Sequence, residues 1–357
     1  MRPTPVTERL GIRHPLVLAP MAGGPSTPAL AAAVSEAGGL GSYGAAYLPL
    51  EKLREEIRAI RARTAKPFAV NLFADDGVAA APAALRAAQA ALAGIRDELG
   101  VAEKPPAPTP SLAQAFAVLL EEKVPVFSFT FGIPPREILD LCRAAGIVTM
   151  GTATSVAEAR ALEQAGVDMI CAQGAEAGGH RGVFDRDAEP PLIGTMALVP
   201  QVVDAVRAPV IAAGGIMDGR GFAAALALGA EAVSMGTAFL LCPEARTSAP
   251  YRAALREARD DSTVITRAFS GRAARGLANR FTREMSAAPL APYAVQNSLT
   301  REIRAAAAKA GNPDFLSLWA GQAAPLAREL PAAELVAQVV READAVLAKL
   351  REGPSAR

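Results

Sequence analysis

The chain has 357 residues, of which 37 are Lys or Arg and 36 are Asp or Glu, so its formal net charge is +1. This balance argues against nucleic acid as the main partner, because such binding usually needs a basic face. Hydrophobic residues make up 51% of the chain and charged residues 20%, which is typical of a globular protein and not of a disordered one. No uninterrupted apolar run reaches about 18 residues, so we expect no membrane-spanning helix and no membrane partner.

The cysteine content narrows the chemistry further. The three cysteines, Cys142, Cys171 and Cys242, are scattered and have no CxxC spacing. This pattern favours a reducing compartment and argues against a disulfide framework or a metal site of the zinc type. The N-terminal segment lacks the apolar stretch of a signal peptide, so we predict a cytoplasmic protein. The near-neutral charge is compatible with a homodimer.

Eight short apolar segments end in small or polar residues and are predicted to be strands. They are nearly continuous apolar runs, which suits a parallel sheet covered on both faces. The segments are Leu16–Met21, Leu40–Ala45, Phe68–Phe73, Val126–Gly132, Ile147–Thr152, Met169–Gly174, Val210–Gly215 and Ala232–Phe239. Helix-like stretches separate them. Eight such repeats predict an α/β fold, a closed (β/α)8 TIM barrel, with a doubly wound open sheet as the main alternative.

The crossover segments are rich in Ala, Leu, Glu and Arg and are predicted to be helices. They are Thr27–Ala37, Leu50–Ala62, Pro134–Ala145, Ser155–Ala165, Met196–Val206 and Gly219–Leu228. The third crossover is about twice the usual length. We expect it to hold two helices, Ala79–Leu99 and Ser111–Glu122, joined by the proline-rich linker Lys104–Pro110.

The long segment after the eighth strand is also predicted to be mainly helical. Its helices are expected at Ala249–Asp260, Gly271–Thr282, Leu299–Ala310 and Ala332–Leu350. One of them should close the barrel as its eighth helix, and the others could form a cap over the C-terminal face. We therefore divide the chain into a barrel (1–240), a helical cap near the site (241–290) and C-terminal helices that pack back on the barrel (291–357).

A barrel would separate the two histidines of the chain, because barrel sites lie at the C-terminal ends of the strands. His14 precedes the first strand and is interpreted as a turn or capping residue at the opposite end. His180 follows the sixth strand, in the glycine-rich loop Gln173–Gly182. A neutral imidazole there could take a proton or bind a substrate oxygen near neutral pH. A loop histidine that is merely exposed is the alternative.

The ends of the seventh and eighth strands indicate an anion site. They carry Gly214-Gly215 and Gly236-Thr237, which offer backbone N–H groups just before a helix. Barrels often bind phosphate with these two loops. Glycines that only permit tight turns are the alternative.

Polar and small residues at other strand ends could hold a flat ring. The first strand ends in small residues around Met21 and Ala22. Asn71 lies inside an apolar strand and needs hydrogen-bond partners if it is buried. Its amide, like that of Gln173, can both donate and accept, which suits the edge of an isoalloxazine ring. A structural role for both amides is an equally good interpretation.

Three other features are assigned structural roles. The GxGxxG pattern of Gly39–Gly44 closes a helix and enters a strand, so we do not interpret it as a dinucleotide fingerprint. Arg301, Glu302 and Arg304 are predicted to form a solvated helix face. The single tryptophan, Trp319, is interpreted as a packing anchor.

Taken together, the segments resemble the class I nitronate monooxygenases, a family once called 2-nitropropane dioxygenase. The resemblance covers nearly the whole chain, and QGAEAGGHRG with SLWAGQ is its most specific part. It is carried by APMAGGPSTPALAAAVSEAGGLG (Ala19–Gly41), NLF (Asn71–Phe73), FSFTFG (Phe127–Gly132), QGAEAGGHRG (Gln173–Gly182), AAGGI (Ala212–Ile216), YAVQNSLT (Tyr293–Thr300) and SLWAGQ (Ser317–Gln322).

The resemblance implies FMN at the C-terminal mouth of the barrel. The implied ligands are Met21, Ala22, Asn71, Gln173, Gly178 and Gly179, with Gly214, Gly215, Met235, Gly236 and Thr237 around the phosphate. His180 matches the family's active-site histidine, and Tyr293 is our candidate substrate contact. The implied reaction is oxidative denitrification of alkyl nitronates, such as propionate 3-nitronate, by O₂ through a flavin semiquinone. A carbonyl compound and nitrite or nitrate are the products.

Other functions on the same scaffold stay open. One is an FMN-dependent enoyl-thioester reductase that uses NAD(P)H, and another is an NADH:quinone reductase. A flavin-binding or sensory protein without turnover is a third. Reduction of the flavin by a nicotinamide coenzyme would distinguish the reductases. The group that stabilises the N1 edge of the reduced flavin also stays open, with Arg181 or a helix dipole as candidates.

Overall fold

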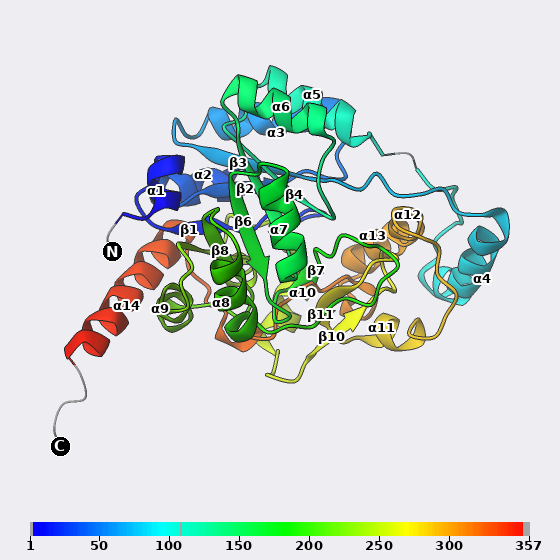
Figure 1. The fold of residues 1–357 in the computed structure, drawn as a ribbon. Helices are drawn as coiled ribbons and strands as arrows, with labels where there is room; N and C mark the ends of the chain where they lie inside the picture. The colour runs from blue at the N-terminus through cyan, green and yellow to red at the C-terminus, as the bar shows by residue number, and fades with distance from the viewer. Residues whose placement is uncertain (1–2, 108, 353–357) are drawn as a thin grey trace.

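The computed structural model describes residues 3–107 and 109–352, and its centre is a barrel of eight parallel strands (Figure 1). The strands are β1 (Leu16–Leu18), β2 (Gly41–Gly44), β3 (Phe68–Phe73), β4 (Val126–Thr130), β5 (Val148–Ala153), β6 (Met169–Gln173), β8 (Val210–Ala213) and β9 (Ala232–Met235). They are paired in the order β1-β9-β8-β6-β5-β4-β3-β2. A parallel bridge between Val17 and Leu40 joins the two ends of this order. The predicted TIM barrel and its eight strands are therefore confirmed.

Alternation along the strands produces two apolar layers. Residues such as Val17, Met150 and Ile211 form a buried cluster with Cys171, whereas their neighbours in sequence pack outward against the helices. Helix α1 (Pro5–Leu10) contributes Val6 and Leu10 to the first cluster. This end of the barrel is therefore filled by side chains and leaves the C-terminal mouth for a site.

The crossover helices lie where the sequence predicts them. They are α2 (Pro28–Glu36), α3 (Leu50–Arg61), α6 (Arg136–Ala145), α7 (Val156–Gln164), α8 (Thr195–Ala205) and α9 (Gly219–Ala227). Their ends follow local rules: the Ser155 side chain caps α7 by accepting from the backbone N–H of Glu158, and Gly146 ends α6 with φ +69°. The strands and helices thus alternate around the barrel.

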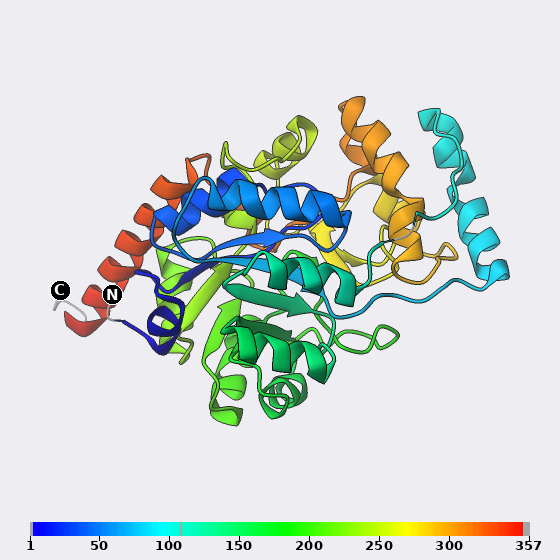
Figure 2. The same cartoon turned by 90° about the horizontal axis from the view of Figure 1, so that it is seen from above.

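The third crossover contains the two predicted helices, α4 (Pro82–Leu99) and α5 (Leu112–Glu121). Helix α5 packs beside α3 on the barrel, but α4 extends away from it and packs against α13 (Arg301–Lys309) (Figure 2). Pro108 of the predicted linker lies outside the described residues. An insertion early in the chain therefore becomes part of the cap.

The cap contains a small sheet that the sequence does not reveal. Strands β10 (Thr263–Thr266), β11 (Ala274–Leu277) and β7 (Gly179–His180) pair antiparallel in that order. The prediction of a helix over 271–282 is wrong, because β11 and the start of α11 (Arg280–Glu284) occupy it. The other cap elements are η1 (Thr237–Phe239), α10 (Ala249–Arg256), α12 (Val295–Leu299), η2 (Pro313–Phe315) and η3 (Ala324–Leu326). The cap is therefore mixed α and β.

The last helix, α14 (Ala332–Glu352), packs against α9 and α2. Its buried residues Leu335, Val336 and Val339 join the barrel core. It fills the eighth outer position, as expected for one of the C-terminal helices. Residues 1–2 and 353–357 of the predicted regions lie outside the described residues.

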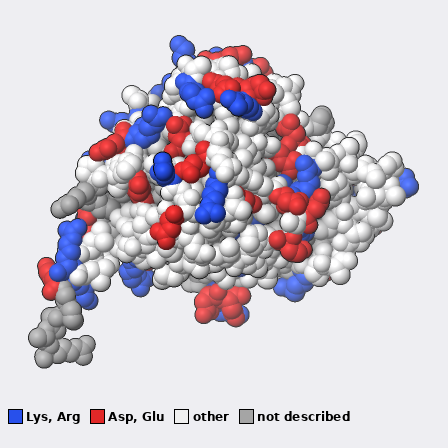
Figure 3. Space-filling model, viewed as in Figure 1, with Lys and Arg blue, Asp and Glu red and all other residues white. Residues whose placement is uncertain are grey.

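The surface carries charges of both signs. On the face shown in Figure 3, basic and acidic side chains are interspersed. Within residues 3–107 and 109–352, none of the helices combines the length and the apolar character needed to span a bilayer.

Candidate functional site

A cavity of about 480 Å³ opens at the C-terminal ends of the barrel strands. Its wall is formed by the residues that end β1, β3, β6, β8 and β9 and by two cap segments, residues 297–308 and 316–323. Its volume falls in the range of ligand sites, about 300–1,000 Å³. The cavity lies at the barrel mouth, where sites of this fold are found.

Most of the predicted site residues come together here. Those lining the cavity are Met21, Ala22, Asn71, Gln173, Gly178, Gly179, His180, Gly214, Gly215, Gly236 and Thr237. Two others lie outside its lining. Met235 is buried in the barrel core, because alternation along β9 turns Ser234 toward the cavity instead. Tyr293 packs beside His180, with ring centroids 6.4 Å apart, and lines a smaller neighbouring pocket.

Gln173 and β7 hold His180 in place. Strand β7 pairs with β11, so that His180 lies opposite Ala274. The Gln173 Nε2 donates to the His180 carbonyl at 2.9 Å, and its Oε1 accepts from the Gly182 N–H at 2.9 Å. The amide of Gln173 therefore has the structural role that was one of its two interpretations, while the residue also borders the cavity.

Ser270 lies between the imidazole of His180 and the backbone of Arg272. The imidazole Nε2 lies 2.8 Å from Ser270 Oγ. The Ser270 hydroxyl donates to the Arg272 carbonyl at 3.2 Å and accepts from the Arg272 N–H at 3.3 Å. The Nδ1 makes no hydrogen bond to a described residue and is the ring nitrogen left for a substrate.

His180 is neutral at physiological pH. Four rings surround it at centroid distances between 5.5 and 6.4 Å, those of Phe73, Phe131, Tyr293 and Trp319. Desolvation, together with the positive charges of Arg272 and Arg304, lowers the pKa of His180 to about 3. The imidazole is therefore unprotonated over the whole neutral range and can accept a hydrogen bond or a proton, although so low a pKa also makes it a weak base. Trp319 packs as predicted, against His180 and Phe269, and also borders the cavity.

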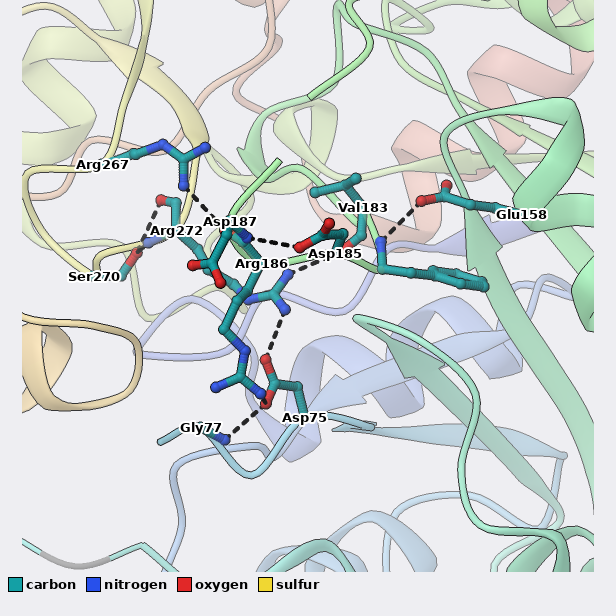
Figure 4. A network of polar contacts seen from close by, with 11 residues as sticks. Asp75, Gly77, Glu158, Val183, Asp185, Arg186, Asp187, Arg267, Ser270 and Arg272 are labelled. Carbon is teal, nitrogen blue, oxygen red and sulfur yellow. Dashed lines mark hydrogen bonds and ion pairs between the residues drawn. The ribbon is translucent and has the colours of Figure 1, made fainter. Parts of the chain in front are cut away.

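A buried ion-pair network ties together the loops around His180 (Figure 4). The two carboxylate oxygens of Asp75 accept from Arg186 Nη2 and from Arg272 Nη2, both at 2.6 Å. The side chains of Asp75 and Arg272 are only 7% and 2% exposed. Asp75 also accepts from the Gly77 N–H at 2.8 Å. It therefore links the loop after β3 to the loop after β6 and to the β10–β11 loop that carries Ser270.

Asn71 presents a free acceptor to the cavity. It is buried, and its Nδ2 donates to Ser128 Oγ at 3.1 Å. No described residue donates to its Oδ1. Arg181, in contrast, lies behind the wall and is fully buried. Its guanidinium donates to the carbonyls of Gly174 at 2.5 Å and Gln173 at 2.9 Å, so its charge reaches the cavity only from a distance.

Glycines let the backbone form the cavity wall. Gly214 has φ +114° and Gly179 has φ +78°, and nothing lies within 4 Å of where a Cβ on Gly179 would be. A Cβ on Gly178 would lie 2.5 Å from the backbone N of Gly321. The Gly321 N–H donates to Thr237 Oγ1 at 3.0 Å. The loop that carries His180 and the segment that carries Gly321 therefore form one continuous wall.

The predicted solvated face on α13 is exposed at Arg301 and half-buried at Arg304, but it also borders the cavity, which was not predicted. Arg301 and Arg304 both line the cavity. Glu302 lies on the other side and pairs with Lys104 at 3.1 Å. The periodic pattern shows that the arginines share a face, but only the position of α13 over the barrel mouth turns that face toward the cavity.

Three further residues of the site are missed by sequence reasoning: Ser270, Asp75 and Tyr47. Tyr47 lines the cavity, and the other two act on His180 from behind. Ser270 comes next to His180 only because β11 pairs with β7. No periodic pattern in the sequence predicts that pairing of β11 with β7.

The cysteines of the chain are free and buried. Cys171 lies in the cavity floor, and burial raises the pKa of its thiol to about 12. It is therefore protonated at neutral pH and a poor nucleophile. The residues that the structure describes contain no group of three or more His, Cys, Asp or Glu side chains that could hold a metal ion.

Comparison with known proteins finds relatives over nearly the whole chain. The family model described as "Nitronate monooxygenase" matches residues 4–342. A nitronate monooxygenase from Pseudomonas aeruginosa is 47% identical over 94% of this chain and 98% of its own length. A probable nitronate monooxygenase from Staphylococcus saprophyticus is 42% identical, over 96% of this chain and 98% of its own length.

Solved structures agree with this. Nitroalkane oxidase from Streptomyces ansochromogenes has a TM-score of 0.91 and 43% identity, and the match covers 97% of this chain and 99% of that chain. FabK from Thermotoga maritima has a TM-score of 0.76 and 33% identity, with 99% of both chains covered.

Proposed function

The chain belongs to the nitronate monooxygenase family, and from this premise we propose that it uses FMN and O₂ to oxidise alkyl nitronates such as propionate 3-nitronate. The products are a carbonyl compound and nitrite or nitrate. The observation that carries the proposal is a neutral His180 at the wall of a glycine-lined cavity at the barrel mouth. The partners of this flavin-type oxidoreductase are accordingly small molecules.

The lining of the cavity fits an FMN. The open backbone at Gly179 and the free Oδ1 of Asn71 are sites where a flat polar ring could bind. The residues proposed to hold the ring are Met21, Ala22, Asn71, Gln173, Gly178 and Gly179, and those for the phosphate are Gly214, Gly215, Gly236 and Thr237. When bound, FMN supplies the ring that accepts electrons from the substrate.

His180 is proposed to act through its Nδ1. With a neutral nitroalkane, this nitrogen removes the proton on the carbon next to the nitro group. A nitronate has already lost that proton, so His180 then only orients it. Ser270 holds the ring by its Nε2, and the surrounding aromatic rings exclude water from the reacting atoms.

A reductase that takes electrons from NAD(P)H, acting on an enoyl thioester or a quinone, is the second candidate. Its support is the shared fold with FabK, which is less similar to this chain than the nitroalkane oxidase is. An anaerobic visible spectrum of the purified holoenzyme separates the two. Propionate 3-nitronate is expected to change the flavin absorption, whereas NADH should leave it unchanged. Rapid bleaching by NADH without a response to the nitronate would reject the monooxygenase.

The His180→Asn variant tests the assigned base. We expect its kcat/KM for neutral nitroethane to fall by about a hundredfold or more, the usual contribution of a general base. The kcat/KM for ethyl nitronate should fall much less. Equal losses on the two substrates would contradict a base role for His180.

Two expectations stay predictions. Free cysteines are consistent with action in the reducing cytoplasm. A homodimer in solution is measurable by light scattering of the purified protein.

A further inference from the structure

The lining of the cavity contains more basic than acidic residues. Arg246, Arg301 and Arg304 line it, and Glu176 is the acidic residue among the described lining residues. The Glu176 carboxylate already accepts from the N–H of Thr195 at 2.9 Å and from its Oγ1 at 2.8 Å. None of the three guanidinium groups forms an ion pair with a described residue. The cavity wall therefore favours the binding of an anion.

Among these three arginines, Arg304 is the one held in place by hydrogen bonds to uncharged groups. Its Nη2 donates to the carbonyl of Asn297 at 2.9 Å and to the Oδ1 of that residue at 2.8 Å, and its Nε donates to the Thr300 carbonyl at 3.3 Å. These acceptors fix the guanidinium but do not neutralise it, whereas the buried Arg272 has Asp75 at 2.6 Å. Burial lowers the pKa of Arg304 only to about 10, so the group stays charged at neutral pH.

A nitronate needs a cation that His180 does not provide. Its negative charge is shared by two oxygens on one nitrogen, but the imidazole is neutral. The charge of Arg304 reaches the imidazole, because it is one of the causes of the low pKa of His180. The contacts of Arg304 use its Nε and Nη2 hydrogens, so the two N–H donors of Nη1 are left for the oxygens of an anion.

We propose that Arg304 is a specificity-determining residue that binds the oxygens of the nitronate and selects the anion over the neutral nitroalkane. This assignment rests on the proposed function. Arg301 lies one turn earlier on the same face of α13 and is exposed, so it adds attraction at the mouth of the cavity. The FMN phosphate has its own proposed site at the ends of β8 and β9.

Nitrate tests the anion site without turnover, because it is a planar, unreactive anion with similar oxygens. Its Kd is measured by calorimetry on the holoenzyme of the wild type, R304Q, R304K, R301Q and R143Q. Arg143 is an exposed arginine paired with Asp140, so R143Q is the matched control for a lost charge. We expect R304Q to weaken nitrate binding by about tenfold or more, R304K to weaken it less, and R143Q to leave it unchanged. No effect of R304Q, or a larger loss in R301Q, overturns the proposal.

Kinetics then separate anion selection from a structural role. In R304Q the KM for ethyl nitronate should rise by about tenfold or more, while the KM for nitroethane, which binds as a neutral molecule, stays within about twofold. Equal rises in the KM of both substrates, or loss of the flavin from both Arg304 variants, overturn the proposal. If R304Q does not fold, R304K carries the test through a KM increase for the nitronate alone. A wild type that binds nitrate through Arg304 but does not oxidise nitronates would reject the proposed function and leave the anion site standing.

Discussion

The surroundings of His180 keep its imidazole neutral at pH values where a histidine is usually protonated. Because the pKa is lowered to about 3 in the folded protein and returns to about 6.5 on unfolding, the unfolded chain binds an extra proton between these values. The contribution of neutral His180 to stability is therefore fully present above about pH 6.5 and is lost as the pH falls toward 3.

The lowered pKa of His180 leads to a prediction about the pH dependence of stability. The melting temperature of the wild type should fall between pH 7 and pH 5. The melting temperature of His180→Asn should fall less over the same interval. His14→Asn is the matched variant, because burial also lowers the pKa of His14, although no aromatic rings of described residues surround it. Its effect on the pH dependence of the melting temperature should be smaller. Equal pH dependence of the wild type and His180→Asn would show that His180 is not held neutral.

Residues at strand ends were predictable, and residues that act through other elements were not. The cavity takes in Asn71, Gln173 and His180, which stand out in the sequence because polar residues are rare next to apolar strands. Arg304 instead has the spacing of an ordinary exposed helix face. Its role depends on where α13 lies, and that position follows from packing between segments far apart in the chain.

At the scale of elements, Asp75 joins three loops that the sequence leaves unrelated. Asp75→Asn would leave Arg186 and Arg272 without a counter-charge in a buried position, and breaking such a pair costs about 3–5 kcal/mol. We expect a loss of the free energy of unfolding of that order in urea denaturation. Glu329→Gln is the control, because Glu329 also bonds two arginines, Arg252 and Arg256, but is half exposed. Similar losses in both variants would show that the network is no stronger than a surface one.

The strands of the cap show why the helix predicted over 271–282 does not form. The segment 271–282 is rich in Ala and Arg, which favour a helix locally. In the structure, a Cβ on Gly276 would lie 2.7 Å from the Leu318 carbonyl, so β11 lies directly against another backbone. That contact and the pairing with β10 and β7 are tertiary, and they override local propensity. The barrel strands, in contrast, carry their own apolar signal.

For the whole molecule, the outer helical layer is completed by the close contact between α9 and α14. A Cβ on Gly219 would lie 2.3 Å from the backbone N of Ala343. Gly219→Ala should therefore push the two helices apart and cost about 1–3 kcal/mol. Gly94→Ala is the matched substitution on α4, where nothing lies within 4 Å of the new Cβ, and it should stabilise by up to about 1 kcal/mol. Thermal melting of the two variants checks this, and a neutral Gly219→Ala would contradict the close contact.

The position of α14 also sets an order of events during synthesis. The ribosome makes α1, β1 and α2 first, then the remaining barrel strands, then most of the cap, and only afterwards α14, which packs against α9 and α2. Until that helix emerges, the nascent chain carries an open apolar seam on its barrel, the kind of surface that chaperones bind. The outer layer of the barrel is therefore completed only after the cap has been translated.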